Sequence, residues 1–297
     1  MNKGIAYAIC AYGIWGLLPV YLKWLHQVPA LQVISHRILW SCLLLGGVIA
    51  LSRQWRAFRA AALTPRILRT YGFAALLIAI NWLTYVWAVD AGRIVEVSLG
   101  YFINPIISVV MGVLFLRERL RPWQWLPVCM VVSGVLYLTV SYGTLPWLAL
   151  ILAFSFGTYG LIKKTAPLGA LHGLTLETGI LLLPALAYLL YADAAGSGAF
   201  LHGSIGMDGL LIAAGPVTAI PLLLFAAATQ RIALTLVGIL QYIAPSLQFL
   251  LGVLVYREPF THAQLIGYGI VWAALIIFAL EGLHAHRAQS VAAVIDF

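Results

Sequence analysis

The chain has 297 residues, of which 63% are hydrophobic and 9% are charged, and its formal net charge is +8. Soluble domains carry about 25% charged residues, so this composition excludes a water-soluble protein and indicates an all-α polytopic membrane protein. Apolar segments fill the chain and leave no room for a separate soluble domain.

Ten apolar segments follow one another along the chain. A helix needs roughly 20 apolar residues to span a bilayer, and we therefore predict ten transmembrane helices. The longest loops are expected at 52–70 and 192–207. No small-residue cleavage site follows Met1-Asn2-Lys3, so we expect the first helix to be retained. The predicted helices cover residues 4–25, 31–51, 71–91, 94–116, 123–140, 145–163, 171–191, 208–229, 232–255 and 262–280.

Basic residues are unevenly shared between the two sides of the predicted bundle. Lys23, Arg93 and Arg257 fall on the side opposite the N-terminus, and Arg37 falls within a helix. Basic loops tend to stay in the cytoplasm, so both termini are predicted to be cytoplasmic. Contact with lipid headgroups is the alternative role of these loops, and their distribution does not indicate a nucleic-acid partner. The loops on the N-terminal side hold Lys3, Arg53, Arg56, Arg59, Arg66, Arg69, Arg117, Arg119, Arg121, Lys163, Lys164, Arg231 and Arg287.

An internal repeat is visible in the sequence. Residues 93–124 align with residues 233–264 without a gap, and nine of the 32 aligned pairs are identical. A weaker similarity relates Tyr12–Leu17 to Phe156–Leu161. We infer a duplicated membrane unit, as in many transporters. The identical pairs are Val97/Val237, Ile103/Ile243, Pro105/Pro245, Gly112/Gly252, Val113/Val253, Leu114/Leu254, Arg117/Arg257, Glu118/Glu258 and Gln124/Gln264.

The duplication predicts two five-helix repeats, residues 1–142 and 143–297. Because five is an odd number, the second repeat must cross the membrane in the opposite sense. Arg117-Glu118 is then expected inside and Arg257-Glu258 outside. Two inverted units can exchange conformations and so expose a central site to each side in turn. The sequence therefore predicts a secondary transporter that works by alternating access, with its site near the midplane.

Few charged groups lie inside the predicted helices, where each costs roughly 2.5–3.5 kcal/mol. His36 and Arg37 lie in the second helix, and Glu177 aligns with His36 in the seventh. We predict that Glu177 pairs with a substrate amine or exchanges a proton, and that Arg37 meets an anionic group. The alternatives are snorkelling for Arg37, stabilisation by the helix N-terminus for Glu177, and neutral packing for His36.

Prolines interrupt the two helices of the main repeat. Pro105 and Pro245 each remove a backbone N–H and are expected to kink their helices. The neighbouring Asn104 and Gln241 either satisfy the freed backbone or face a cavity. A simple kink without ligand contact is the alternative.

Several aromatic side chains lie deep in the predicted helices rather than at their ends. They are candidates for lining an amphipathic or aromatic solute, and Asn81 is a candidate hydrogen-bonding group beside them. Packing against neighbouring helices is the alternative. These aromatic candidates are Trp15, Trp82, Tyr101, Tyr159 and Tyr242.

Enzymatic motifs are absent from the sequence. It contains no H-E-x-x-H, no G-x-S-x-G, no carboxylate pair within the predicted helices and no phosphate-binding GK[ST] loop. Cys10, Cys42 and Cys129 lack metal-ligand spacing. We therefore expect no catalytic residue, metal or cofactor; the expected partners are a small-molecule solute and the lipid bilayer. The alternative functions are a non-transporting membrane scaffold or sensor and, less favoured, a membrane-embedded enzyme.

Five short motifs resemble those of EamA-type permeases of the drug/metabolite transporter superfamily, and in particular its RarD-type branch. The resemblance runs over nearly the whole chain and implies a bacterial inner-membrane permease, usually an exporter of small metabolites or drugs, with its pore between the two halves. It supplies neither a substrate nor catalytic residues. The motifs are Ile14-Trp15-Gly16, Ser35-His36-Arg37, Asn81-Trp82-Leu83, Ser98 through Pro105, and Gln241-Tyr242-Ile243.

Overall fold

The computed structural model describes residues 2–91, 94–142 and 147–255, together with separate helical positions between 262 and 281. Within this part of the chain all regular elements are helices, which confirms the predicted all-α class. The predictions for Arg93, Arg257-Glu258, Arg287 and the C-terminus fall outside the described residues. The helices are α1 Lys3–Trp24, α2 Ala30–Leu51, α3 Trp55–Ala62, α4 Pro65–Asp90, α5 Ile94–Leu116, α6 Trp125–Tyr142, α7 Trp147–Thr165, α8 Ala170–Ala194, α9 Ile205–Thr229, α10 Leu234–Leu240 and α11 Ile243–Leu250.

Five of these helices, α1, α2, α4, α8 and α9, are long and apolar enough to cross a membrane. Polar caps start two of them. The Asn2 side chain accepts a hydrogen bond from the Gly4 backbone N–H, and Ser204 accepts one from the Met207 N–H. The bounds of α1, α2 and α4–α9 follow the first eight predicted segments closely, except that α4 begins earlier, at Pro65.

The structure corrects two of the expected elements. The expected loop 52–70 contains the short helix α3 and the start of α4. The ninth segment, expected to be one helix over 232–255, is broken between α10 and α11 and ends in a π-helical turn, Leu251–Val255. The break follows from Pro245, which has no N–H for the Gln241 carbonyl. That carbonyl accepts instead from the Ala244 N–H, at 3.2 Å.

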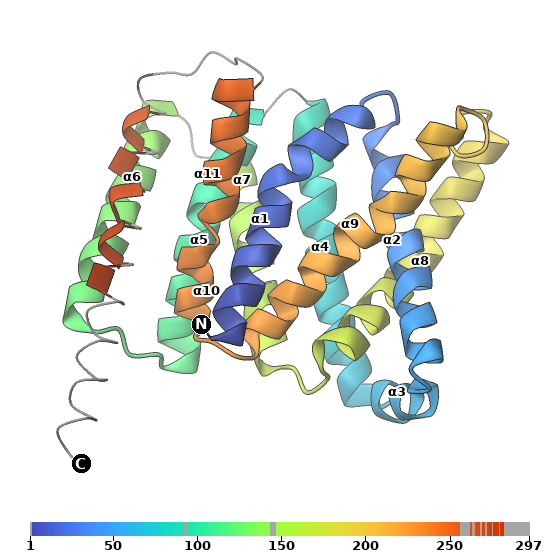
Figure 1. The fold of residues 1–297 in the computed structure, drawn as a ribbon, viewed down its shortest axis with the longest axis horizontal. Helices are drawn as coiled ribbons and strands as arrows, with labels where there is room; N and C mark the ends of the chain where they lie inside the picture. Colours follow the sequence, from blue (N-terminus) through green and yellow to red (C-terminus); the bar gives the residue numbers. More distant parts are fainter. Residues whose placement is uncertain are drawn as a thin grey trace.

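The long helices run side by side and alternate in direction, and α3 lies across one end of the bundle, below α2, α4 and α8 (Figure 1). α6 lies at the opposite edge, beside the helical positions after residue 262. In the middle α1 packs on α9 and α11, α2 on α8 and α9, α4 on α7 and α8, and α5 on α7 and α10. The largest buried cluster combines side chains of α1, α4, α7 and α9.

The outer surface of the bundle is apolar. Large side chains such as Leu183, Val140 and Ile205 are 75%, 78% and 92% exposed. Water would disfavour so much exposed apolar surface, whereas lipid tails match it. Buried polar and charged side chains lie inside the bundle instead, among them Arg37's partner Thr218 and the pair Lys163 and Glu177. This inside-out distribution fits a protein that sits in a bilayer.

Candidate solute pathway

Arg37 is held inside the bundle by neutral groups from two other helices. Its Nε donates a hydrogen bond to the Thr218 Oγ1 of α9 at 2.8 Å, and its guanidinium carbon lies 4.8 Å from the centre of the Trp82 ring of α4. No carboxylate among the described side chains lies within ion-pair distance of Arg37. The side chain therefore turns inward and does not snorkel to a headgroup, and its charge lacks a described counter-charge. We call Arg37, Thr218 and Trp82 the arginine centre.

Tyrosines surround the arginine centre. The hydroxyls of Tyr21, Tyr85 and Tyr101 lie within electrostatic range of Arg37. The rings of Tyr85 and Tyr101 are 6.3 Å apart, and Tyr101 remains 36% exposed. The Tyr21 hydroxyl donates to the Leu210 carbonyl at 2.7 Å. A cation flanked by aromatic faces and hydroxyls can hold a solute that combines an anionic group with a flat apolar body.

Glu177 has very different surroundings. Its Oε1 lies 2.8 Å from the Lys163 Nζ of α7, and its Oε2 accepts a hydrogen bond from the Tyr159 hydroxyl at 2.9 Å. Lys163 also lies over the rings of Tyr71 and Tyr159, at 5.4 and 5.6 Å. Both members of the ion pair are fully buried. We call Glu177, Lys163, Tyr159 and Tyr71 the lysine–glutamate centre.

This centre corrects the expected role of Lys163, which sequence analysis assigned to an inner loop. Lys163 lies in the last turn of α7 and folds back into the bundle, while Lys164 donates to the Ile232 carbonyl at 2.6 Å. The sequence carried a usable signal, because Tyr159 and Lys163 are four residues apart and so share one face of a helix. A lysine on the same face as a deep tyrosine is poorly explained as a loop charge.

The two centres lie at different levels along the bundle. Helix α4 contributes to both, with Tyr71 near its start and Trp82 eleven residues later. At 1.5 Å per residue this spacing corresponds to about 16 Å along the helix. Arg37 and Glu177, both expected on one solute path, therefore belong to two separate clusters.

An aromatic cluster lies between the halves of the chain next to the lysine–glutamate centre. The rings of Trp15 and Phe156 are 5.9 Å apart, those of Phe156 and Phe225 are 5.2 Å apart, and Tyr159 stacks on Phe225 at 6.1 Å. The buried Tyr12 hydroxyl has no hydrogen-bond partner among the described residues. Trp15 and Tyr159, both expected from the sequence, therefore meet in one cluster, and Tyr12 is a polar group that sequence analysis missed.

Two other candidates, His36 and Asn81, contact residues that belong to neither centre. The buried His36 ring lies 5.3 Å from the ring of Phe200, and its Nδ1 has no described partner. Asn81 donates to the Leu152 carbonyl and to the Ser155 hydroxyl of α7, both at 3.0 Å. Asn81 thus links α4 to α7, and its amide nitrogen is already engaged in hydrogen bonds to the protein.

Helix α5, which contains Pro105, crosses α10 at close range. The Gly238 position of α10 leaves no space for a side chain, because a Cβ there would lie 2.8 Å from the Pro105 carbonyl oxygen. The Tyr242 hydroxyl donates to the Phe102 carbonyl at 2.9 Å. Asn104 and Gln241 are buried, and the described residues offer no partner to their side-chain carbonyl oxygens.

Glu118 joins the same two helices in a way that the sequence did not reveal. Its carboxylate accepts from the backbone N–H groups of Leu234 and Thr235, at 2.6 and 2.8 Å, and from the Thr235 hydroxyl at 2.6 Å. It thereby caps the start of α10 from the end of α5. Gly112 lies against this contact, since a Cβ there would come within 2.7 Å of the carboxylate.

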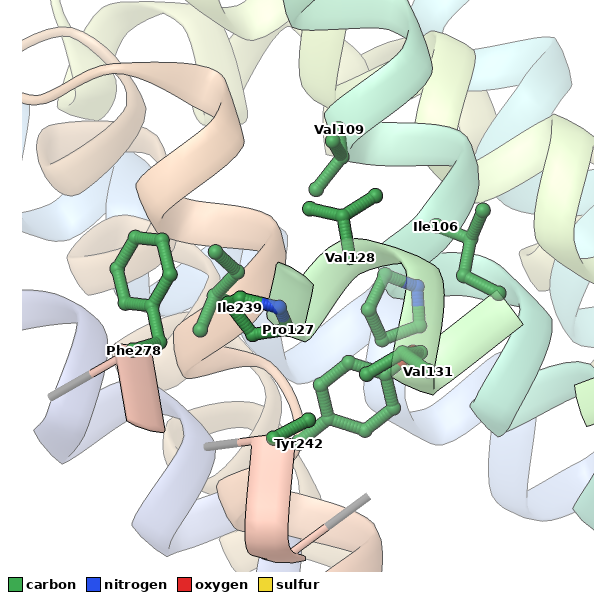
Figure 2. Close-up of a pocket in the computed structure, with 10 residues that line it drawn as sticks. Ile106, Val109, Pro127, Val128, Val131, Ile239, Tyr242 and Phe278 are labelled. Atoms are coloured by element: carbon green, nitrogen blue, oxygen red, sulfur yellow. The ribbon is translucent and has the colours of Figure 1, made fainter. Parts of the chain in front are cut away.

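A pocket lies beside the crossing of α5 and α10 (Figure 2). Its lining is apolar and includes Pro105 and Val109 of α5, Val131 of α6 and the ring of Tyr242. It contains neither Arg37 nor Glu177. Because it offers no charged group, we do not assign a polar solute to it.

Comparison with known proteins places this architecture in a family. The EamA-like transporter family matches residues 2–140. A protein called RarD from Streptomyces exfoliatus is 44% identical over 286 residues, which cover 96% of this chain and 91% of that protein. An uncharacterized transporter of Vibrio cholerae is 44% identical over 288 residues, covering 97% of this chain and 95% of its own.

A solved crystal structure has the same fold, with a TM-score of 0.71, 18% sequence identity, and coverage of 94% of this chain and 98% of the other. At that identity the likeness concerns the fold alone. The family match and the full-length relatives, together with the apolar helices and the polar interior, lead to one conclusion: the chain belongs to the EamA-like transporter family and is similar to RarD proteins over nearly its whole length.

Proposed function

We propose that this protein is a secondary permease of the bacterial inner membrane that moves a small solute, in the export direction, by alternating access. In this proposal ten transmembrane helices form two inverted five-helix repeats, residues 1–142 and 143–297, and both termini are cytoplasmic. The solute occupies the space between the repeats, and its path includes the arginine centre and the lysine–glutamate centre.

The observation that carries the proposal is the symmetry of the helix contacts. If α1, α2, α4 and α5 correspond to α7, α8, α9 and α10–α11, the most extensive contacts between these two groups of helices each have a counterpart with the groups exchanged. α4 packs on α7 as α9 packs on α1, α4 packs on α8 as α9 packs on α2, and α5 packs on α7 as α11 packs on α1. The contacts α2 with α8 and α5 with α10 join corresponding helices. Such exchangeable halves are what alternating access requires.

The lysine–glutamate centre supports coupling to protons. Lys163 Nζ already occupies the place beside Glu177 that a solute amine would need, so of the two roles expected for Glu177 we propose proton exchange. A proton on the Glu177 carboxylate would remove its negative charge and weaken its hold on Lys163. Because Lys163 belongs to α7 and Glu177 to α8, this event would loosen one helix from the other.

The arginine centre supports recognition of an anionic group on the solute. Arg37 presents a guanidinium whose described partners, Thr218 and Trp82, are both neutral. A carboxylate or phosphate on the solute would supply the counter-charge and can accept two parallel hydrogen bonds. The tyrosines nearby would cover the apolar part of such a solute.

The test begins with purified protein and a panel of small solutes, because a ligand that binds the folded state raises its apparent melting temperature. Solutes that do so are then measured for flux into proteoliposomes with and without a pH gradient. We expect Glu177→Gln and Arg37→Ala each to abolish flux while membrane insertion stays normal. Cys10→Ala, an exposed change away from both centres, is the control and should transport normally.

Wild-type flux in both variants would contradict the assigned roles of the two centres. If flux does not depend on the pH gradient, the proposal of proton coupling is wrong, whereas the proposal of a permease stands. Solute binding without any flux would instead favour a membrane sensor.

A further inference from the structure

A basic and apolar strap follows α2 along the chain. It comprises residues 51–69, that is, the turn after α2, the short helix α3 and the first turn of α4. The strap contains no Asp or Glu. Its five arginines are all exposed, and no carboxylate among the described side chains pairs with them. These arginines are Arg53, Arg56, Arg59, Arg66 and Arg69.

Helix α3 is fixed to the bundle by one face only. Phe58 and Ala62 are buried in a cluster with Ile49, Tyr71 and Leu168. The adjoining Gln54 side chain hydrogen-bonds to the His172 ring at the start of α8, at 3.0 Å. The strap is thus a docked part of the fold, with a defined outer surface.

The outer surface of the strap mixes charge with apolar groups. Arg56 and Arg59 lie away from the buried face of α3, and close to the arginines in the chain Leu51 and Trp55 are 87% and 44% exposed. Leu63 is exposed as well. Arginines alternating with exposed Leu and Trp are the pattern of segments that lie in the headgroup region of a bilayer, where guanidinium groups meet phosphates and apolar groups meet acyl chains.

The place of the strap in the fold agrees with this pattern. α3 lies across one end of the long helices (Figure 1), between the end of α2 at Leu51 and the start of α4 at Pro65. A helix there reaches headgroups without entering the hydrocarbon. Arg53 has a left-handed backbone, with φ of 56°, at the position after a helix where glycine is usual. Arginine therefore occupies a backbone position that glycine would adopt with less strain.

We propose that the strap is a binding surface for anionic phospholipid headgroups, with phosphatidylglycerol as its test ligand. The headgroup phosphates sit between Arg56, Arg59 and the neighbouring arginines, and Trp55 lies among the upper acyl carbons. The buried side of the strap connects the lipid-binding surface to the interior of the bundle. Phe58 shares its cluster with Tyr71, and the Lys163 Nζ lies 5.4 Å from the Tyr71 ring. Bound lipid therefore stabilises the end of the bundle that contains the lysine–glutamate centre.

The test measures lipid-dependent stability of the full-length protein in an uncharged detergent. Phosphatidylglycerol or phosphatidylcholine is titrated in, and the melting temperature is recorded at each lipid fraction. We expect phosphatidylglycerol, and not phosphatidylcholine, to raise the melting temperature of the wild type. Arg56→Gln/Arg59→Gln should need about thirtyfold more phosphatidylglycerol for the same rise, since each basic residue near a charged surface contributes about a factor of five.

Two matched variants make the test specific. Arg56→Lys/Arg59→Lys keeps the charge and should respond like the wild type. Lys3→Gln/Arg119→Gln removes two exposed charges outside the strap and should also respond like the wild type. The proposal is overturned if phosphatidylcholine acts as well as phosphatidylglycerol, if Arg56→Gln/Arg59→Gln keeps the wild-type response, or if the Lys3→Gln/Arg119→Gln control loses as much as that variant.

Discussion

The arginine centre and the lysine–glutamate centre are both built around a charge inside the bundle, yet they balance that charge differently. Glu177 finds a cation and a hydroxyl within 3 Å, both from the protein itself. Arg37 finds a hydroxyl and an aromatic face, and no described carboxylate. The first centre is closed and neutral, and the second carries a net positive charge. An ion pair between α7 and α8 can hold these helices together and release them when it breaks. A cation without a protein counter-charge can instead bind an anionic group of a solute.

The change with the largest predicted effect tests whether the charge pair of the lysine–glutamate centre stabilises the fold. Glu177→Leu leaves Lys163 buried without a counter-charge and should lower the free energy of unfolding by about 3–5 kcal/mol. The double variant Lys163→Met/Glu177→Leu removes both charges and should regain most of this loss. Thermal unfolding of the purified proteins measures both values. If the double variant is as unstable as Glu177→Leu, charge pairing is not what holds α7 to α8.

A smaller effect is expected at the arginine centre. Arg37→Met removes a cation whose described partners are neutral, so no opposite charge is left buried by the change. We expect the free energy of unfolding to fall by about 1.5–3 kcal/mol, the range for one hydrogen bond to a charged group. The same unfolding measurement applies. A loss as large as that for Glu177→Leu would mean that Arg37 has a structural role like that of the ion pair.

The change with the smallest predicted effect on stability tests whether Thr218 orients Arg37. Thr218→Val removes the hydroxyl that accepts from Arg37 Nε and should lower the free energy of unfolding by about 1.5 kcal/mol, the lower end of the range for a hydrogen bond to a charged group. Because Arg37 then loses its fixed orientation, solute affinity should fall more than stability does. Thr229→Val on the same helix is the control, since among the described residues the Thr229 hydroxyl bonds to the Ala226 carbonyl of its own helix and to no other helix. Equal losses of solute affinity in the two variants would argue against a positioning role for Thr218.

Part of the candidate site could be read from the sequence because burying a charge in a membrane is costly. Arg37 and Glu177 stood out for that reason, and Trp82 and Tyr159 stood out as deep aromatics; the structure places each aromatic beside one of the charges. His36 and Asn81, which looked equally deep, instead contact Phe200 and residues of α7. Depth along a helix follows from sequence position, but the direction in which a side chain points depends on the neighbouring helices.

Lys163 and Glu118 show what sequence position concealed. Both lie near helix ends, where basic and acidic residues are ordinarily solvated. Lys163 turns back to Glu177, and Glu118 reaches the N–H groups at the start of α10, 116 residues further along the chain. A carboxylate that caps a helix from so distant a position leaves no local pattern. Only the packing of α5 against α10 brings the two together.

The amino-acid sequence alone predicts the class of protein and the places of most helices, because both depend on runs of apolar residues long enough to cross a bilayer. It also singled out Pro245, whose missing N–H breaks the helix between α10 and α11. The tertiary structure decided which polar groups meet. Thr218 lies 181 residues from Arg37 in the chain. Contacts over such separations arise from the crossing of helices, and in a nearly uniform apolar sequence no local signal specifies them.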